Sequence, residues 1–135
     1  MKFLVDANVL SEATKPSPSP KVISWLVEHE ADLAVNPVIL GELEYGILLL
    51  TASKRRARLE AWFQTGVQRF RVLDMDAKTA SSWARMLARL KRKGLAMPVK
   101  DSLIAATAET HGLTVATRNT HDFRNSGVPV VDPFV

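Results

Sequence analysis

The chain contains no cysteine among its 135 residues. It can therefore form no disulfide bond, thiolate metal site or cysteine nucleophile, and its composition suits a reducing compartment. It also lacks an apolar run of the roughly 20 residues that a membrane-spanning helix needs. The first ten residues, MKFLVDANVL, place an Asp where the apolar segment of a signal peptide would lie. We therefore expect a cytoplasmic protein with no membrane partner.

The composition is that of an ordinary globular protein. Hydrophobic residues make up 47% of the chain, charged residues make up 24%, and the mean hydropathy is +0.01. A chain of this length can bury a core of its own. It shows no repeat, low-complexity tract or linker, so we expect a single domain over residues 1–135.

Positive charge is concentrated in the middle of the chain. Twelve of the eighteen Lys and Arg residues lie between residues 54 and 93, together with three of the fourteen Asp and Glu residues. We call this segment the basic block. Such a block indicates a phosphate-bearing partner, although solvated helix faces produce the same pattern.

Short apolar runs alternate with longer amphipathic segments along the chain. The alternation predicts strands separated by helices, which is typical of an α/β domain with a mostly parallel sheet. Right-handed crossovers place helices on both faces of such a sheet. The expected strands are residues 3–5, 32–35, 71–73, 113–117 and 128–131.

The helix boundaries carry their own signals. Ser19, Asn36 and Asp76 have the side chains of N-cap residues, and proline follows the first two directly. Gly94 and Gly112 stand where helices should end. On the helix that Asp76 begins, the apolar spacing predicts an inward face made of Ala80, Trp83, Ala84 and Leu87.

The fourteen acidic residues are few enough to be considered one by one. Most fall on polar helix faces or in turns, and we expect Glu12 to be one of these solvated residues. Four acids do not fit this pattern, because each follows a strand, begins a helix or interrupts an apolar helix: Asp6, Glu42, Asp101 and Asp122. Ligands of an open parallel sheet gather outside the carboxyl ends of its strands. We therefore expect these four carboxylates to meet there.

Carboxylates that meet near a core repel one another, and burial forces their protonation unless something compensates. A divalent cation removes the conflict, and hard oxygen donors favour Mg²⁺ or Mn²⁺ over Zn²⁺. Each acid also has a structural alternative. Asp6, Asp101 and Asp122 could cap turns or helices, and Glu42 could lie on an exposed helix face.

Four segments resemble the motif blocks of the PIN-domain family: DANVLSE at Asp6, ELEYGI at Glu42, MPVKDSLIAATA at Asp101 and ATRNTHDF through Asp122. The similarity covers residues 2 to about 133, and it is greatest to the VapC and FitB-like toxins of toxin–antitoxin pairs. The resemblance implies a three-layer α/β/α fold with a four- or five-stranded, mostly parallel sheet. Lys100 departs from the pattern, because its ammonium could compete with a metal or contact an RNA phosphate.

The resemblance also implies an activity, that of an endoribonuclease dependent on Mg²⁺ or Mn²⁺ whose products carry a 5′-phosphate and a 3′-hydroxyl. The family's metal-binding and catalytic acids correspond to Asp6, Glu42, Asp101 and Asp122. Nearby polar residues that match supporting positions are Asn8, Thr117 and Asn119. The basic block then becomes a candidate RNA-binding surface that includes Lys54, Arg55, Arg56, Arg85 and Arg89, with Lys91, Arg92 and Lys93 as a possible extension.

The partners that the resemblance implies are an RNA substrate, a cognate antitoxin and a second copy of the chain in a homodimer. The apolar surfaces of the helices at residues 38–50 and 53–70 suit dimerisation, and core packing explains the same surfaces equally well.

Other functions use strand-end carboxylates too. A receiver-like phospho-acceptor domain needs paired acids after its first strand and an acceptor Asp in mid-chain, and a haloacid-dehalogenase-type phosphatase needs Asp-x-Asp. Here Asp6 is single, and the corresponding triplet is Asp6-Ala7-Asn8. A non-catalytic RNA-binding PIN relative is a third alternative, although such proteins often lack one or more of the acids that this chain retains.

Overall fold

The computed structural model describes residues 1–135 apart from the side chain of Gln68. Five strands of the described chain form one sheet in the order β3-β2-β1-β4-β5, and each neighbouring pair is parallel. The expected parallel sheet is thus confirmed. The strands are β1 (Phe3–Val5), β2 (Leu33–Val35), β3 (Arg71–Val72), β4 (Thr114–Ala116) and β5 (Val130–Val131).

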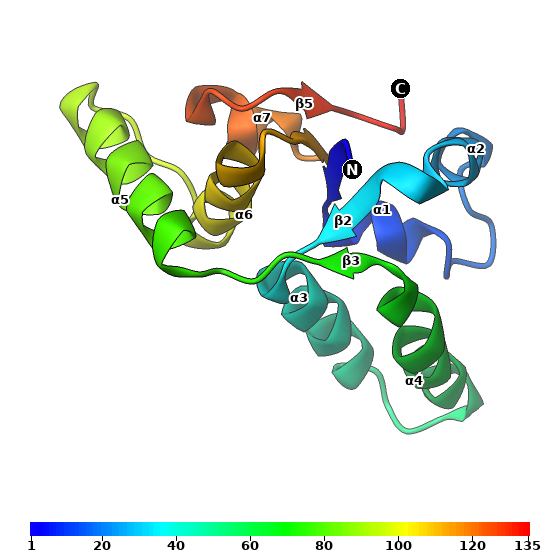
Figure 1. The fold of residues 1–135 in the computed structure, drawn as a ribbon. Helices are drawn as coiled ribbons and strands as arrows, with labels where there is room; N and C mark the ends of the chain where they lie inside the picture. The colour runs from blue at the N-terminus through cyan, green and yellow to red at the C-terminus, as the bar shows by residue number, and fades with distance from the viewer.

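Helices connect the strands and flank the sheet (Figure 1). None of the described helices is long and apolar enough to cross a membrane. The α-helices are α1 (Ala7–Glu12), α2 (Pro20–Glu28), α3 (Pro37–Leu48), α4 (Lys54–Gly66), α5 (Ala77–Arg92), α6 (Val99–His111) and α7 (Thr120–Phe123). Short 3-10 turns are η1 (Glu30–Asp32), η2 (Val67–Arg69) and η3 (Arg124–Ser126).

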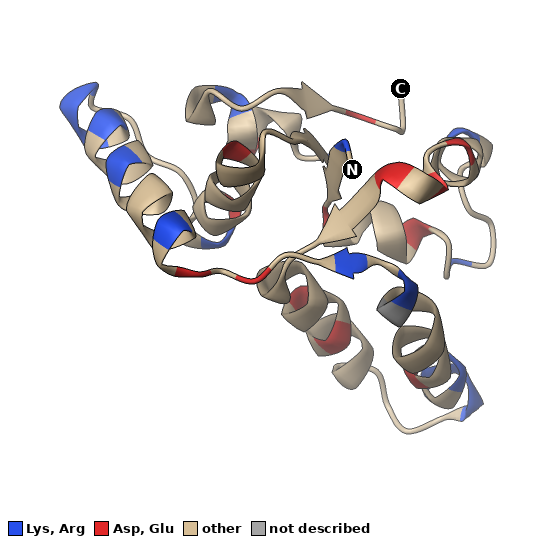
Figure 2. Cartoon of the chain, viewed as in Figure 1, with Lys and Arg blue, Asp and Glu red and all other residues tan. Residues whose placement is uncertain are grey.

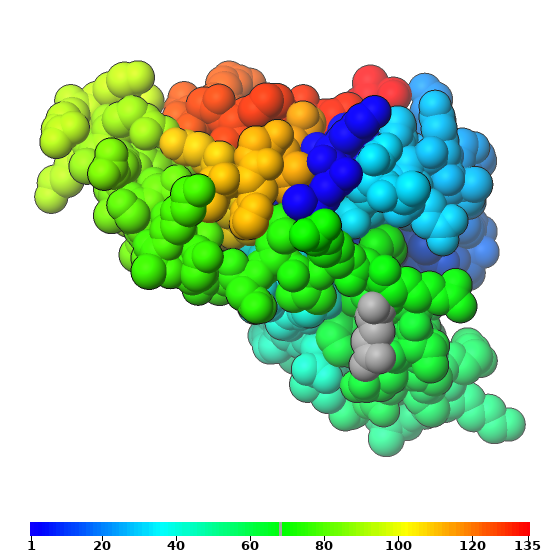
Figure 3. Space-filling model, in the orientation of Figure 1, coloured from blue at the N-terminus to red at the C-terminus, as the bar shows by residue number. Residues whose placement is uncertain are grey.

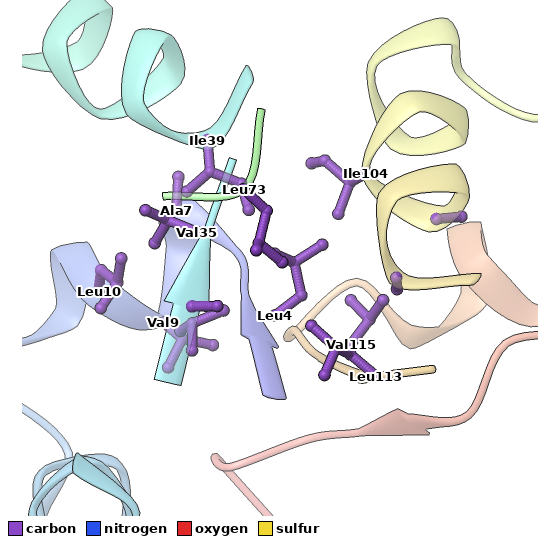
Figure 4. Packing of buried hydrophobic residues seen from close by; sticks show 14 of the residues in the cluster. Leu4, Ala7, Val9, Leu10, Val35, Ile39, Leu73, Ile104, Leu113 and Val115 are labelled. Atoms are coloured by element: carbon purple, nitrogen blue, oxygen red, sulfur yellow. The ribbon is translucent and has the colours of Figure 1, made fainter. Parts of the chain in front are cut away.

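The core lies on both faces of the three inner strands, β2, β1 and β4. Figure 4 shows Val9 and Leu10 of α1 on one side of the sheet and Ile104 of α6 on the other. Leu4 in β1 and Val115 in β4 are fully buried between these layers. A strand that is covered on both faces is apolar at every position, because both of its sides face the core. Such strands could therefore be predicted from short apolar runs in the sequence. This arrangement confirms the expected α/β/α layers.

Capping side chains fix where several helices begin. Asn36 accepts a hydrogen bond from the Ile39 N–H at 2.9 Å, and Asp76 accepts one from the Thr79 N–H at 3.0 Å. Both expected N-caps are therefore confirmed. Ser19 occupies the N-cap position of α2 directly before Pro20, as predicted, although its side chain makes no capping hydrogen bond.

Two glycines end helices in the left-handed conformation that other residues rarely adopt. Gly94 follows α5 with a φ of 68°, and Gly112 follows α6 with a φ of 66°. The Leu113 N–H then reaches back to the Ala108 carbonyl at 2.9 Å. This bond satisfies a carbonyl that the last turn of the helix leaves free. The chain then passes from α6 directly into β4.

The inward face of α5 differs from the expected one. Its fully buried residues are Thr79, Met86 and Leu90, whereas Trp83 and Leu87 are half-buried and Ala80 and Ala84 are exposed. The prediction was wrong about the two alanines because a small apolar side chain marks a helix face weakly. Thr79 is a polar residue, but its burial is tolerated because its hydroxyl donates a hydrogen bond to Asp76 Oδ1 at 3.0 Å. This bond compensates the loss of water from the hydroxyl.

The charged surfaces lie on separate parts of the molecule. Figure 2 shows positive residues along α5 and again around the start of α4, with acidic residues on α3. In Figure 3 the α5 end and the α3–α4 end project in different directions from the body. The basic block is therefore two surfaces in the folded protein.

Replacing Asn36 tests how strongly the interior depends on one polar side chain. Asn36 is fully buried, caps α3 and donates to Thr107 Oγ1 at 3.0 Å. Asn36→Ala should lower the free energy of unfolding by about 2–3 kcal/mol, since a cap and a buried hydrogen bond are lost together. Urea denaturation measures the change. The matched control is Ser53→Ala, which removes the exposed cap of α4 and should cost about 1 kcal/mol or less; equal losses would contradict the account.

Candidate active site

The ends of β1 and β4 bring three polar side chains together. The Asp6 carboxylate accepts hydrogen bonds from the Ala7 N–H and from the Thr117 hydroxyl, each at 2.8 Å. The Asn8 side-chain amide donates to Thr117 Oγ1 at 3.2 Å, and its side-chain carbonyl accepts from the Arg118 N–H at 3.1 Å. Asp6 is thus the N-cap of α1 and also a buried carboxylate that Thr117 holds in place.

Asp101 enters the same region from α6. It lies in the first turn of that helix and is 4% exposed, and the N-cap position belongs to Pro98 instead. The Trp83 indole N–H donates to Ser102 Oγ at 2.9 Å, and that hydroxyl donates to the Val99 carbonyl at 2.6 Å. These bonds fasten the first turn of α6 to α5, so the position of Asp101 is fixed by tertiary packing.

Glu42 reaches the region from the middle of α3. Its Oε2 accepts a hydrogen bond from Lys100 Nζ at 2.7 Å, which joins α3 to the first turn of α6. Its Oε1 is buried and has no hydrogen-bond partner within the part of the chain that the structure describes. A buried carboxylate oxygen without a donor is a costly arrangement unless a cation completes it.

Asp122 is supplied by α7, the short helix that follows β4. Asn119 precedes this helix, and its N–H donates to Thr117 Oγ1 at 3.0 Å. The Asp122 N–H donates to the Asn119 carbonyl at 3.0 Å. A chain of hydrogen bonds through residues 117–122 therefore connects the backbone of Asp122 with the Thr117 hydroxyl, which also binds the Asp6 carboxylate.

The carboxylates influence one another's ionisation. Burial, and then the charge of Asp6, raises the pKa of Asp101 to about 6, with smaller contributions from Asp122 and Glu42. Burial also raises the pKa of Asp6, against the opposing hydrogen bond from Thr117. The structure thus brings all four carboxylates within electrostatic reach of one another.

The donors fit a hard divalent cation. They are all oxygens, the acids repel one another, and Glu42 has an oxygen without a partner in the described structure. Among the residues described, no three Asp, Glu, His or Cys side chains stand close enough to enclose an ion by themselves. Mg²⁺ keeps several of its water molecules and commonly takes only one or two carboxylates, so this looser arrangement suits it.

One residue of the basic block shares a cavity wall with Glu42. Arg55 lines a cavity of about 390 Å³ whose wall also contains Asn8, Lys15 and Glu42. Gly46 lies on the same wall, with open space where a larger side chain would project. The cavity therefore lies between Glu42 and positive charge on α4.

The other candidate RNA-binding residues do not line this cavity. Arg56 Nε donates to Glu60 at 2.8 Å, and Arg89 pairs with a carboxylate of α6 at 3.5 Å. Lys54 and Arg85 are exposed on α4 and α5. The structure does not place α5 residues on the cavity that contains Arg55.

Glu12 is buried, which contradicts the expectation that it is solvated. It is 5% exposed, and its Oε2 accepts from the Ser19 N–H at 2.8 Å. Its Oε1 lies 2.9 Å from Lys15 Nζ, and these two partners lower the pKa of Glu12. The residue anchors the proline-rich loop between α1 and α2. The proline-rich loop was the sequence signal that could have indicated the burial of Glu12. Prolines have no backbone N–H to donate, so such a loop needs a side chain nearby to hold it in place.

Comparison with known proteins identifies the family. The PIN domain model matches residues 3–127. The VapC ribonuclease Y4jK of Sinorhizobium fredii is 33% identical over 98% of this chain and 97% of its own length. The toxin FitB of Neisseria gonorrhoeae is 35% identical, and the match covers 98% of each protein. A solved structure of FitAB bound to a DNA fragment superposes with a TM-score of 0.92 at 31% identity, covering 98% of this chain and 96% of that one.

The chain therefore belongs to the PIN domain family. Within that family it is similar to VapC ribonucleases and to FitB, as the sequence motifs predicted. The order of strands and helices agrees with this membership along almost the whole chain. The receiver-like and phosphatase alternatives are thereby set aside.

The raised pKa of Asp101 makes a prediction about stability without metal. Asp101 binds its proton more tightly in the folded state than in the unfolded state, because its folded pKa is about 6 and its ordinary value is 3.8. The free energy of unfolding should therefore fall as the pH rises from about 4 to 6. Asp101→Asn should raise it at pH 8 by about 1–2 kcal/mol, after allowance for solvent screening.

Thermal and urea denaturation in EDTA at pH 4 and pH 8 measure this difference. The gain should disappear at pH 4, where both proteins are neutral at this position. Asp74→Asn is the control, because Asp74 is exposed and its replacement should have an effect of about 0.5 kcal/mol or less. A destabilised Asp101→Asn protein at pH 8 would show that the carboxylate is not under repulsion.

Proposed function

We propose that the protein is an endoribonuclease dependent on Mg²⁺ or Mn²⁺ and the toxin of a toxin–antitoxin pair. The observation that carries the proposal is the approach of four carboxylates, from four separate parts of the chain, close enough for the charges of three to act on the fourth, Asp101. The names of the relatives, a VapC ribonuclease and the toxin FitB, support the same activity. A non-catalytic RNA-binding role is the second candidate, and the retention of all four acids disfavours it.

Each acid has a proposed role. Asp6 and Asp101 are the buried carboxylates that bind the ion directly, and Glu42 offers its free Oε1. Asp122 acts through water or at a second ion. Thr117 holds the Asp6 carboxylate by its hydroxyl, and Asn8 and Asn119 hold that hydroxyl in turn, as the hydrogen bonds above indicate.

A divalent cation bound by these acids would lower the pKa of the attacking water and offset charge that develops on the phosphate. Water attacks the phosphorus, the bond to the 3′ oxygen breaks, and that oxygen takes up a proton. The products are a 5′-phosphate and a 3′-hydroxyl. The chain's own contribution is to hold the acids in fixed positions before substrate arrives.

The RNA is proposed to approach along the cavity that contains Arg55 and Lys15. Arg55 is exposed on the first turn of α4 and shares that wall with Glu42. Lys54 and Arg56 extend the positive surface around it. Arg85 and Arg89 on α5 would contact more distant phosphates, since neither lines the cavity that contains Glu42 and Arg55.

We further propose that the whole chain is one nuclease domain that works in the cytoplasm with two protein partners. A cognate antitoxin would neutralise it; FitAB, the structural relative, is a complex by its name. A second copy would cover exposed apolar side chains at the end of α3, where Tyr45 is 62%, Leu48 52% and Leu49 66% exposed. Exposed apolar residues gathered in one place are typical of interfaces.

Cleavage assays with a panel of RNAs test the proposed activity. Asp6→Asn and Asp101→Asn should each reduce the cleavage rate by about 100-fold or more, because each removes a charge that the transition state needs. EDTA should abolish wild-type cleavage, and added Mg²⁺ or Mn²⁺ should restore it. Glu44→Gln is the matched control on α3, since Glu44 is exposed, and it should leave the rate near wild type. Full cleavage in EDTA would refute the metal mechanism.

Binding of RNA by Asp101→Asn protein, which should not cleave it, tests the proposed track. Arg55→Ala should weaken binding and reduce the dependence of log K on log salt by about 1, as expected for the loss of one phosphate contact. Arg85→Ala on α5 is the comparison and should have a smaller effect. A fluorescence-anisotropy titration at several salt concentrations measures both. A larger effect of Arg85→Ala would move the track to α5.

A further inference from the structure

Lys100 is the positive side chain that the structure places among the carboxylates. Its Nζ lies 2.7 Å from Glu42 Oε2, and its charge also acts on Asp6 and Asp101. The ammonium therefore stands where negative charge from three elements of the fold converges. The family's acidic site, as it maps onto this chain, assigns no role to this residue.

Lys100 is more exposed to solvent than its partner Glu42. The Lys100 side chain is 51% exposed, whereas that of Glu42 is 29% exposed. A lysine has a flexible four-carbon stem, and a strongly hydrated ammonium regains water when it leaves a carboxylate. Lys100 can thus move away from the site while Glu42 stays on α3.

A divalent ion and the ammonium compete for the same negative charge. An ion bound by one or two of the Asp6, Asp101 and Glu42 carboxylates would lie close to the Lys100 ammonium, because Lys100 pairs with Glu42 and its charge acts on the other two acids. Repulsion between a doubly charged ion and a unit charge at short range exceeds the attraction of one partly exposed ion pair. The ammonium must therefore yield when the ion arrives.

We propose that Lys100 is an exchangeable counter-ion of the active site: its ammonium neutralises Glu42 in the metal-free protein, the divalent ion displaces it, and the released ammonium binds the phosphate of the RNA. The proposal rests on the function proposed above and adds a substrate-binding residue to it. A lysine attached next to Asp101 cannot travel far, so the released ammonium remains at the mouth of the site. Lysine commonly binds phosphate as a point charge.

Calorimetric titration with Mn²⁺, in the absence of RNA, tests the displacement. Lys100→Gln removes the competing charge and keeps a side chain of similar length, so its dissociation constant for Mn²⁺ should fall by about threefold or more. Lys100→Arg keeps the charge and should remain near wild type. Lys78→Gln is the matched control, because it removes the same unit charge from an exposed residue of α5 that does not pair with Glu42; it should leave the constant unchanged.

Weaker or unchanged Mn²⁺ binding by Lys100→Gln would overturn the proposal. Weaker binding would mean that the lysine positions Glu42 for the ion. A wild-type protein that binds no Mn²⁺ would overturn it as well. Thermal melts of each variant establish that the comparison is made between folded proteins.

Cleavage at saturating Mn²⁺ tests the phosphate contact. Lys100→Gln should reduce kcat/KM by about 10-fold or more, as expected for a lost charge-assisted hydrogen bond, although it binds the metal more tightly. The opposite signs of the two effects are the signature of exchange. Unchanged kcat/KM would refute the phosphate contact. If the wild type binds Mn²⁺ but cleaves no RNA, the proposed function fails and the phosphate contact fails with it, while the Mn²⁺ comparison still decides the displacement.

Discussion

The repulsion between carboxylates at one end of the sheet is the constraint on which the rest of the structure depends. Asp6 and Asp101 are buried there, and burial together with neighbouring charge raises the pKa of both. The chain opposes this cost with local donors. Thr117 and the Ala7 N–H bind the Asp6 carboxylate, and Lys100 pairs with Glu42. These compensations hold the acids together without removing the negative charge that attracts a cation.

The fold serves this arrangement by bringing distant segments to one edge. β1 and β4 are neighbours in the sheet, so Asp6 and Thr117 follow adjacent strands although 111 positions separate them in the chain. α6 carries Asp101 to the same edge, and the bond from Trp83 to Ser102 fixes its first turn. A parallel sheet with helices on both faces produces such a meeting of strand ends as a matter of topology.

Much of this architecture could be predicted from the sequence, because the signals were local. The apolar strands, the caps at Asn36 and Asp76 and the stops at Gly94 and Gly112 depend on residues near one another in the chain. The buried state of Glu12 and the bond between Trp83 and Ser102 could not be predicted with the same rules. The first depends on how the proline-rich loop folds back onto Glu12, and the second on the packing of α5 against α6. Spacing within one helix carries no information about either. Lys100 was visible beside Asp101, but its pairing with Glu42 required the packing of α3 against α6.

The central claim is that these carboxylates form one site for a divalent ion. The most direct test is anomalous diffraction from crystals of the protein grown with Mn²⁺. The account predicts a manganese peak between the carboxylates of Asp6 and Asp101, with Lys100 Nζ no longer on Glu42. A peak elsewhere on the surface, or none at a concentration that supports cleavage, would contradict it.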